Sequence, residues 1–449
     1  MAMKLTIGFV LGFGMVWGQV PMKALNPRVA KIVAEVSAER IGAVMKRLEE
    51  FGTRTLFSSQ EDPKRGIGAA ARWIRDEMAS YSPRLQVRLD SHDVKKSGRV
   101  FRDGRLENVV AVLPGTTQKD RQVLITGHYD SLHIVRKKVG ELERMDQEAT
   151  VAADAPGVSD DASGTAAVME LARVLSGYEF EKTLVFVAFS GEEYGLLGSG
   201  PYAKRAAAEK SIIDAVLNND IIGNDVAGNG RTAGTAVRLF SEDPIDSASR
   251  TLARYVKEIG ERYVPAMTVN LVFRADRFGR GGDHTPFDRA GFAAVRFTTT
   301  AEFYANQHTA SDTFANASPV YTARVARVDA AVAATLALAP PAPDVLTRTK
   351  SPITGLEVSG PNLSRGKSGY DALLKWKEQG DVTDLAGFAV VWRESVSPYW
   401  QKEFWVGPGK EFRLTDVSID DIILGVKAVD KEGNESPVAV YRIVPRLVP

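Results

Sequence analysis

The sequence predicts an α/β fold, with a mostly parallel central sheet covered by helices on both faces, followed by a small all-β sandwich. Three observations predict it. Segments 122–126 and 183–189 are apolar throughout, which is typical of strands buried on both faces of a sheet. Helical patterns such as 164–175 separate them, which favours parallel pairing. After about residue 350, short segments of alternating polarity replace the helical patterns.

The first eighteen residues have the composition of a secretory signal peptide. Lys4 precedes an uncharged and largely apolar run, Leu5 to Trp17, and Val16 and Gly18 are small residues at positions −3 and −1 of a cut after Gly18. The run is shorter than the roughly 20 residues of a membrane span. A buried N-terminal helix or strand is the alternative. We therefore expect a mature chain that has no stable membrane span and is secreted or periplasmic.

Residues 25–338 are expected to form one α/β domain, because helical and strand patterns alternate along this stretch. The expected elements, in chain order, are an amphipathic helical stretch over 29–48, a helix over 69–81, strands over 85–89, 108–113 and 122–126, a helix over 164–175, a strand over 183–189, a helix over 197–210 that Pro201 would interrupt, and strands over 215–217 and 293–298.

A proline cluster marks the end of this domain. Pro340, Pro341 and Pro343 cannot continue the preceding alanine-rich helix, so residues 339–350 are expected to be a linker. Residues 351–449 then read as a β-sandwich. This region resembles a fibronectin type III domain, which implies that Trp376 is its buried tryptophan. Ile422 stands where that family places a corner tyrosine. The expected strands are 373–377, 387–393, 411–414 and 422–430.

Composition excludes several kinds of site. The chain of 449 residues has no cysteine, so disulfides, thiolate nucleophiles, cysteine-ligated zinc and iron–sulfur clusters are ruled out. The net charge of +1 gives no reason to expect a nucleic-acid partner. Any metal site must be built from histidine and carboxylates, and there are only five histidines.

Acidic and histidine residues follow the ends of the predicted strands. Residues 127–130 follow one strand, 190–193 the next and 218–220 a third, while 157–161 precede a helix. Because ligand sites of open parallel sheets lie at the carboxyl ends of the strands, these segments are expected to converge. Clustered carboxylates repel one another unless a cation is bound. With histidine and carboxylate ligands, zinc is the leading candidate, with Mn²⁺ or Co²⁺ as alternatives, and two metals with a bridging carboxylate would account for five ligands.

Five motifs carry a family resemblance. They are GHYDS, PGVSDDASGTAA, FSGEEYGLLGS, LNND and QHTASDT. In this order they resemble the cocatalytic dizinc exopeptidases typified by bacterial leucyl aminopeptidases, over about residues 35–335. The resemblance implies a zinc exopeptidase-like fold and two Zn²⁺ ions.

The resemblance also implies roles for single residues. Asp160 would be the bridging carboxylate, and His128 and Asp220 would serve different metals, although the full partition of ligands stays open. Glu192 would be the general base that takes a proton from a metal-bridging water. Asp130 would hold the imidazole of His128. The implied metal ligands are His128, Asp160, Glu193, Asp220 and His308.

Two departures from the family pattern concern the cleft. Many relatives have a tyrosine before the last ligand histidine, where this chain has Gln307, with Tyr304 three residues earlier. Either residue is a candidate to stabilise the oxyanion, or another donor does so. His284 is a candidate cleft residue. The long segment between Asp130 and Asp160 is either a lid or a solvated excursion.

The sequence therefore predicts an exported, metal-dependent exopeptidase, most simply a zinc aminopeptidase that acts on peptide substrates. The alternatives are a carboxypeptidase or a glutaminyl cyclase-like enzyme on the same scaffold. The cyclases use one metal, so the metal content would distinguish them. A catalytically silent binding module is a third alternative, and the presence of Glu192 together with every candidate ligand argues against it. The oligomeric state is open.

Overall fold

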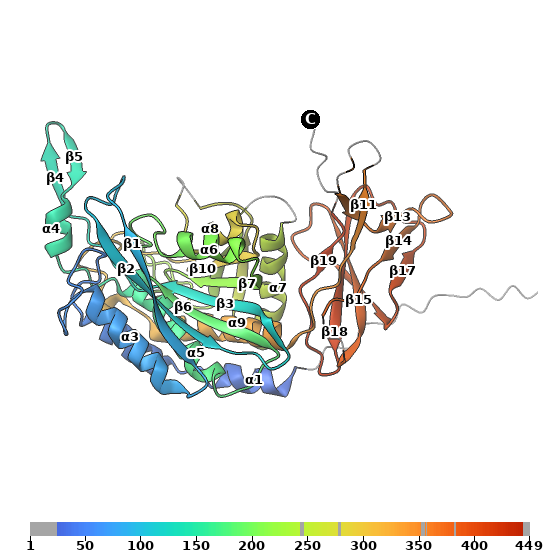
Figure 1. Ribbon diagram of the computed structural model, residues 1–449, viewed down its shortest axis with the longest axis horizontal. Coiled ribbons are helices and arrows are strands. Elements are labelled where there is room, and N and C mark those ends of the chain that lie inside the picture. Colours follow the sequence, from blue (N-terminus) through green and yellow to red (C-terminus); the bar gives the residue numbers. More distant parts are fainter. Residues whose placement is uncertain are drawn as a thin grey trace, which may run out of the picture.

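The computed structural model describes residues 25–242, 247–276, 280–351, 355, 357–380 and 383–442 (Figure 1). The signal peptide expected over residues 1–18 lies outside the described residues. Within the described ranges, no helix combines the length and the apolar character needed to cross a bilayer.

One large sheet organises the N-terminal unit. Its spatial order is β1-β2-β6-β3-β7-β10-β8-β9. The central strands β6, β3, β7 and β10 are parallel to one another, whereas β1, β2 and β8 introduce antiparallel pairs towards the edges. The strands are β1 (Gln86–Val94), β2 (Gly104–Leu113), β3 (Gln118–His128), β6 (Lys182–Phe189), β7 (Ile212–Asn219), β8 (Ala236–Phe240), β9 (Thr268–Val272) and β10 (Ala294–Thr299).

Helices cover both faces of this sheet. Helices α6 and α8 lie on the opposite face of the sheet from α1, α3, α5 and α9 (Figure 1). Buried side chains of α1, α2, α3, α5, α7 and α9 contribute to the larger hydrophobic core, and those of α6 and α8 to a smaller one. The helices are α1 (Pro27–Ala34), α2 (Ala38–Glu49), α3 (Ile67–Tyr81), α4 (Gln147–Ala152), α5 (Ser163–Leu175), α6 (Ser199–Ala208), α7 (Ala248–Tyr263), α8 (His284–Arg289) and α9 (Pro319–Leu338).

Two expected helices differ in detail from the structure. The helical stretch over 29–48 is divided into α1 and α2, because the side chain of Ser37 accepts a hydrogen bond from the backbone N–H of Arg40 and so begins a new helix. Pro201 does not interrupt α6, because it lies in the first turn, where no intrahelical N–H is needed.

The long segment before Asp160 forms a hairpin and a short helix. Strand β4 (Arg136–Val139) pairs antiparallel with β5 (Leu142–Met145), and α4 follows directly. The hairpin projects from the rest of the N-terminal unit (Figure 1).

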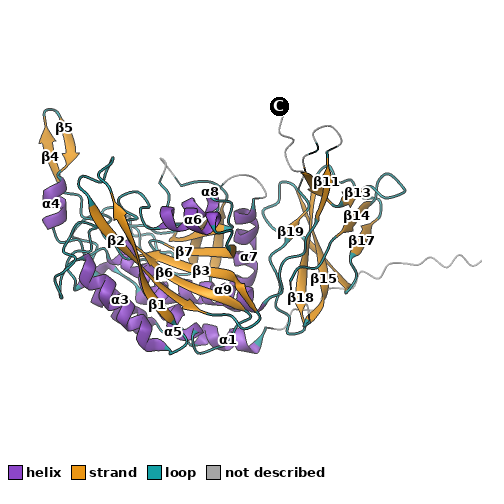
Figure 2. Cartoon of the chain, viewed as in Figure 1, coloured by secondary structure: helices purple, strands orange, loops and turns teal. Residues whose placement is uncertain are grey.

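Strands are the only regular elements among the described residues of the C-terminal region (Figure 2). Trp376 is buried in its core against Phe388, as expected. Residues 346–350 are not linker as expected, because they form β11 and pair with 357–361. The strands are β11 (Leu346–Lys350), β12 (Glu357–Pro361), β13 (Leu363–Ser364), β14 (Ala372–Lys375), β15 (Leu385–Glu394), β16 (Lys402–Gly407), β17 (Glu411–Leu414), β18 (Ile422–Asp430) and β19 (Ala439–Val440).

Side chains of helix α7 contact the C-terminal all-β region. Arg262 donates a 2.8 Å hydrogen bond to the carboxylate of Glu435, and the hydroxyl of Tyr255 donates to the backbone oxygen of the same residue at 2.7 Å. Nε of Arg254 donates to the backbone oxygen of Pro398 at 2.9 Å. The all-β region is therefore docked against the α/β unit through polar contacts.

Candidate metal centre

The carboxyl ends of three central strands bring the predicted ligands together. Strand β3 has parallel neighbours on both sides, β6 and β7, so the three ends lie next to one another. His128 ends β3, Glu193 follows β6 after a short turn, and Asp220 follows β7 directly. The turn before α5 supplies Asp160, and the loop after β10 supplies His308. All five predicted ligands therefore lie at one edge of the sheet.

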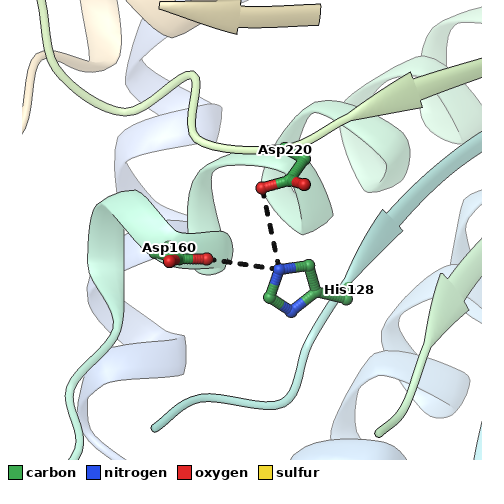
Figure 3. A group of neighbouring side chains, drawn as sticks. All are labelled: His128, Asp160 and Asp220. Carbon is green, nitrogen blue, oxygen red and sulfur yellow. Dashed lines mark ion pairs between the residues drawn. The ribbon is translucent and has the colours of Figure 1, made fainter. Parts of the chain in front are cut away.

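His128, Asp160 and Asp220 form a first group of facing ligand atoms (Figure 3). Nε2 of His128 lies 3.3 Å from Oδ1 of Asp160 and 3.9 Å from Oδ1 of Asp220. All three side chains are buried. His128 and Asp220 were expected to serve different metals, and the structure instead places them in one group. The reason is strand pairing, since β3 and β7 are direct neighbours.

Asp160, Glu193 and His308 form a second group. Nε2 of His308 lies 3.2 Å from Oδ2 of Asp160 and 3.0 Å from Oε2 of Glu193. The two oxygens of Asp160 therefore face different imidazoles. A carboxylate placed in this way can bridge two cations roughly 3.5–4 Å apart. The geometry thus offers two ligand sets that share Asp160.

Burial and the closeness of like charges shift the pKa values of several groups at this edge of the sheet. Loss of solvent, together with the negative charges of Glu193 and Asp220, raises the pKa of Glu192 well above its ordinary value, against the opposing effect of His128. Burial also raises the pKa of Glu193. The charge of Glu193 in turn raises the pKa of His308 to about 11. Divalent cations would relieve the repulsion among these carboxylates.

Two buried polar atoms also fit a metal site. Among the described residues, Nε2 of His128 and Oε1 of Glu193 have no hydrogen-bond partner. Buried polar atoms are normally paired, so an unpaired imidazole nitrogen that faces carboxylates is what a metal ligand requires. Imidazole nitrogen and carboxylate oxygen without thiolate suit Zn²⁺. The residues present therefore fit zinc.

Asp130 holds two of the converging segments. Its carboxylate accepts hydrogen bonds from the backbone N–H groups of Glu192 and Glu193, both at 3.2 Å. Nδ1 of His128 lies 3.2 Å from the backbone oxygen of Asp130 and 3.4 Å from its Oδ1. A proton on Nδ1 directed at these oxygens leaves Nε2 as the lone-pair atom that faces Asp160. Asp130 thus lies against His128 as expected, and it also fixes the turn that carries Glu192.

Asp161 ties three backbone segments together instead of facing a ligand group. Its carboxylate accepts hydrogen bonds from the N–H groups of His128 at 3.1 Å, Gly164 at 2.9 Å and Ile221 at 3.1 Å. The peptide bond between Asp160 and Asp161 is cis. The carboxylate of Asp161 is therefore committed to the backbone that carries the site.

Arg54 supports the site and was not predicted. Its guanidinium is fully buried and donates to the backbone oxygens of Tyr129 at 2.6 Å, Pro156 at 2.8 Å and Gly157 at 2.8 Å. Burial lowers its pKa to about 10. These contacts fix the segment after His128 to the segment before Asp160. No local pattern around Arg54 signals this role, because a single arginine ordinarily indicates a solvated side chain.

Asp312 was also missed, although it stands within the QHTASDT motif. Its carboxylate accepts hydrogen bonds from the backbone N–H groups of Ser159 at 2.8 Å and Asp160 at 3.0 Å. Burial raises its pKa to about 7. Its place four residues after His308 was the signal that could have found it.

Three candidate cleft residues point elsewhere. Nε2 of Gln307 donates to Glu302 at 3.0 Å, and the hydroxyl of Tyr304 lies 3.4 Å from the same carboxylate. His284 is buried, and its Nε2 lies 3.4 Å from Oε1 of Glu242. None of the three belongs to the described residues that line the cleft. An oxyanion role for Gln307 or Tyr304 would therefore require the side chain to leave Glu302.

A cleft of about 580 Å³ opens over the two ligand groups. Its floor carries the carboxylates and His308, and three arginines lie among its walls. The lining residues are Arg99, Asp160, Glu192, Glu193, Gly195, Leu196, Asp220, Ile221, Arg280, Gly281, Thr285, Arg289 and His308.

Comparisons with known sequences identify relatives across most of the chain. A family model described as peptidase family M28 matches residues 108–333. A probable zinc metalloprotease of Pyricularia oryzae is 34% identical over 442 residues, which cover 91% of this chain and 83% of that protein. Another from Leptosphaeria maculans is 33% identical over 449 residues, which cover 93% of this chain and 97% of that protein.

Solved structures share the fold. The LapA aminopeptidase of Legionella pneumophila superposes with a TM-score of 0.52 at 20% identity, covering 71% of this chain and 77% of that one. The glutaminyl cyclase of Porphyromonas gingivalis superposes with a TM-score of 0.52 at 17% identity, covering 66% of this chain and 97% of that one. The predicted fold class is confirmed: a large α/β sheet with helices on both faces and a small all-β region.

Proposed function

Since the chain belongs to peptidase family M28 and is a zinc metallopeptidase, we propose that it is an aminopeptidase that uses two zinc ions to remove residues from the free N-termini of peptides. One observation carries the proposal. The two carboxylate oxygens of Asp160 face two separate imidazoles, His128 and His308, at 3.3 Å and 3.2 Å. One carboxylate can therefore serve two cations at once.

The chain supplies two ligand sets in this proposal. His128, Asp160 and Asp220 would hold one ion, and Asp160, Glu193 and His308 the other. When bound, zinc supplies Lewis acidity, which polarises the scissile carbonyl and lowers the pKa of water. Asp130 and Asp312 keep the ligand-bearing turns in place through backbone hydrogen bonds.

Glu192 is the proposed general base. Its carboxylate would accept a proton from the attacking water and then donate it to the nitrogen of the leaving amine. The side chain lines the cleft beside both ligand groups, and its backbone N–H is held by Asp130 at 3.2 Å. This anchoring fixes where the carboxylate stands relative to Asp160.

The acidic floor of the cleft favours a substrate with a free amino group. The carboxylate oxygens of the floor can accept hydrogen bonds from a free α-amino group even when bound cations balance their charge, and a blocked N-terminus lacks most of these donors. A carboxypeptidase or a glutaminyl cyclase-like enzyme are the alternatives. The shared Asp160 favours a two-metal peptidase over a one-metal cyclase.

We also propose export to the periplasm or the medium, on the strength of the N-terminal sequence alone. N-terminal sequencing of the secreted protein would show Gln19 first if the cut follows Gly18. An intracellular protein that keeps residues 1–18 would contradict this.

The decisive test is Glu192→Gln in the zinc-loaded enzyme, with aminoacyl chromogenic substrates. Removing the base while keeping the shape should lower kcat by roughly 10²- to 10⁴-fold, with two zinc ions per chain retained by elemental analysis. Glu209→Gln, on the exposed end of α6, is the matched control and should keep wild-type activity.

Chelation is the second arm of this test. Removing the metal should abolish release of amino acids, and adding zinc should restore it. If no aminoacyl substrate shows chelator-sensitive release, the aminopeptidase proposal is wrong. Full activity in Glu192→Gln with both metals bound would exclude Glu192 as the base. One metal per chain would favour the cyclase alternative.

A further inference from the structure

The walls of the cleft carry charge of one sign. Arg99 comes from the connection between β1 and β2, Arg280 from the segment before α8, and Arg289 from the last residue of α8. Every carboxylate among the lining residues belongs to the candidate metal centre on the floor, namely Asp160, Glu192, Glu193 and Asp220.

The three arginines differ in their partners. Arg280 is paired, since its Nη1 lies 2.8 Å from Oε2 of Glu302 and 3.7 Å from Oδ2 of Asp276. The guanidinium groups of Arg99 and Arg289 form neither a hydrogen bond nor an ion pair with any described residue, and both side chains are exposed. They are therefore available to a bound molecule.

Bound zinc would leave the positive charge of the wall arginines without an opposing negative charge from the floor. Two divalent cations would balance the four carboxylates that line the cleft. The floor is then close to neutral, and Arg99 and Arg289 have no counter-charge within the cleft. A guanidinium binds a carboxylate through two parallel hydrogen bonds, which makes carboxylate the best-matched anion of a peptide.

We propose that this cleft selects peptides that carry a carboxylate close to the scissile bond, and that Arg99 and Arg289 bind it. The inference rests on the proposed peptidase function of the same site. The carboxylate can come from the side chain of an acidic residue, or from the free C-terminus of a dipeptide or tripeptide. Substrates without it leave both guanidinium groups solvated and bind less tightly.

The test compares matched peptides on the zinc-loaded, full-length enzyme. One arm uses pairs of C-terminally amidated peptides in which one member has Glu and the other Gln at the same position. In one pair this position is directly before the scissile bond, and in a second pair it is directly after it. The other arm compares Leu-Leu as the free acid with Leu-Leu amide. We expect kcat/KM to favour the charged member by about tenfold or more in at least one arm, which identifies the source, with most of the effect in KM.

Substitutions of Arg99 and Arg289 test whether these two residues cause the preference for a carboxylate. The double variant Arg99→Gln with Arg289→Gln should reduce the preference to less than about threefold, and Arg289→Lys should keep part of it because the charge remains. Arg75→Gln changes a partly exposed arginine on α3 that pairs with Asp76; it is the matched control and should keep both activity and preference. Higher salt should weaken the preference, because the two groups are exposed.

Equal kcat/KM for charged and neutral members in both arms overturns the inference, and so does a preference that survives in the double variant. Failure of the proposed aminopeptidase function looks different. In that case no peptide with a free amino group is cleaved, charged or neutral. If only N-acetylated peptides with a free C-terminus are cleaved, the aminopeptidase proposal fails while the carboxylate selection stands.

Discussion

The carboxyl group of Asp329 is fully buried and accepts one hydrogen bond. It lies on α9 and accepts a 2.7 Å hydrogen bond from Nδ2 of Asn219, the residue before Asp220. Burial raises its pKa to about 7, partly offset by that hydrogen bond. An unfolded aspartate has a pKa of about 3.9. The folded chain therefore binds this proton more tightly, and the contribution of Asp329 to stability falls as pH rises from about 4 to 7.

Asp329→Asn should remove this pH dependence. The amide keeps an oxygen that can accept from Asn219 but carries no charge to bury. The free energy of unfolding of the variant should match the wild type near pH 4 and exceed it progressively up to pH 7, by at most about 4 kcal/mol. Denaturant unfolding of both proteins across this range measures the difference. A difference that stays constant with pH would show that Asp329 is not protonated in the fold.

Two adjacent aspartates show what residue identity alone leaves open. Asp160 and Asp161 are the same chemically, yet Asp160 faces two imidazoles. The carboxylate of Asp161 instead accepts hydrogen bonds from the hydroxyl of Ser163 and from the backbone N–H groups of three residues, His128, Gly164 and Ile221. Their positions in the family motif distinguished them. Their neighbours in sequence could not, because the partners that decide the two roles lie on β3 and after β7.

The start of α5 is pressed against the end of β7. A Cβ atom on Gly164 would lie 2.2 Å from the backbone oxygen of Asn219 and 2.3 Å from Oδ2 of Asp161. Gly164→Ala should therefore push apart the elements that carry two of the ligands. We expect a loss of about 1–3 kcal/mol in unfolding free energy, with weaker zinc binding in a metal titration.

Gly200→Ala is the matched control for this change. Gly200 lies in α6, and a Cβ atom there would meet nothing within 4 Å. Alanine should stabilise this helix by about 0.5–1 kcal/mol and leave zinc affinity unchanged. Equal effects of the two substitutions in thermal unfolding would mean that the close approach at Gly164 does not matter.

The sequence left open whether the segment between Asp130 and Asp160 is a lid or a solvated excursion, and the hairpin β4–β5 bears on this choice. Val139 and Leu142 near its tip are 48% and 60% exposed, and none of the hairpin residues lines the cleft. The solvated excursion is therefore the better description of the hairpin itself. Its base still contacts the site, because the N–H of Ile134 donates to the backbone oxygen of His308 at 3.0 Å.

In the whole molecule, Lys427 forms ion pairs at the contact between the α/β unit and the all-β region. Its ammonium group is buried, lies 2.8 Å from Glu403 and 3.3 Å from Glu258, and is hydrogen-bonded to Glu435. Glu258 belongs to α7, and the other three residues belong to the all-β region. A buried cation among three carboxylates stabilises their charges across the interface.

Lys427→Met should break this arrangement by leaving the three carboxylates with too little positive charge. Losing one partner of a buried ion pair costs about 3–5 kcal/mol. Calorimetry should show the all-β region unfolding in a separate transition at lower temperature, with peptidase activity retained below it. Lys410→Met removes an exposed lysine paired with Glu378 at 2.9 Å and should cost less than about 1 kcal/mol. A single transition at the wild-type temperature would contradict the role of Lys427.

The sequence by itself determined the parallel core, the two-part organisation and the kind of metal chemistry. Buried strands and amphipathic helices are local patterns, and the absence of cysteine restricts the ligands to histidine and carboxylate. The predicted ligands and Glu192 were recognisable because each stands in a short family motif, and four of these residues also stand at or shortly after the end of a strand, namely His128, Glu192, Glu193 and Asp220.

Only the tertiary structure decided how these residues are grouped and supported. The pairing of His128 with Asp220 follows from the strand order, which places β7 beside β3. Arg54 and the arginines of the cleft walls contribute through contacts and proximity between segments far apart in the chain. Such relationships depend on how the chain packs, and a local pattern of residue types does not encode them.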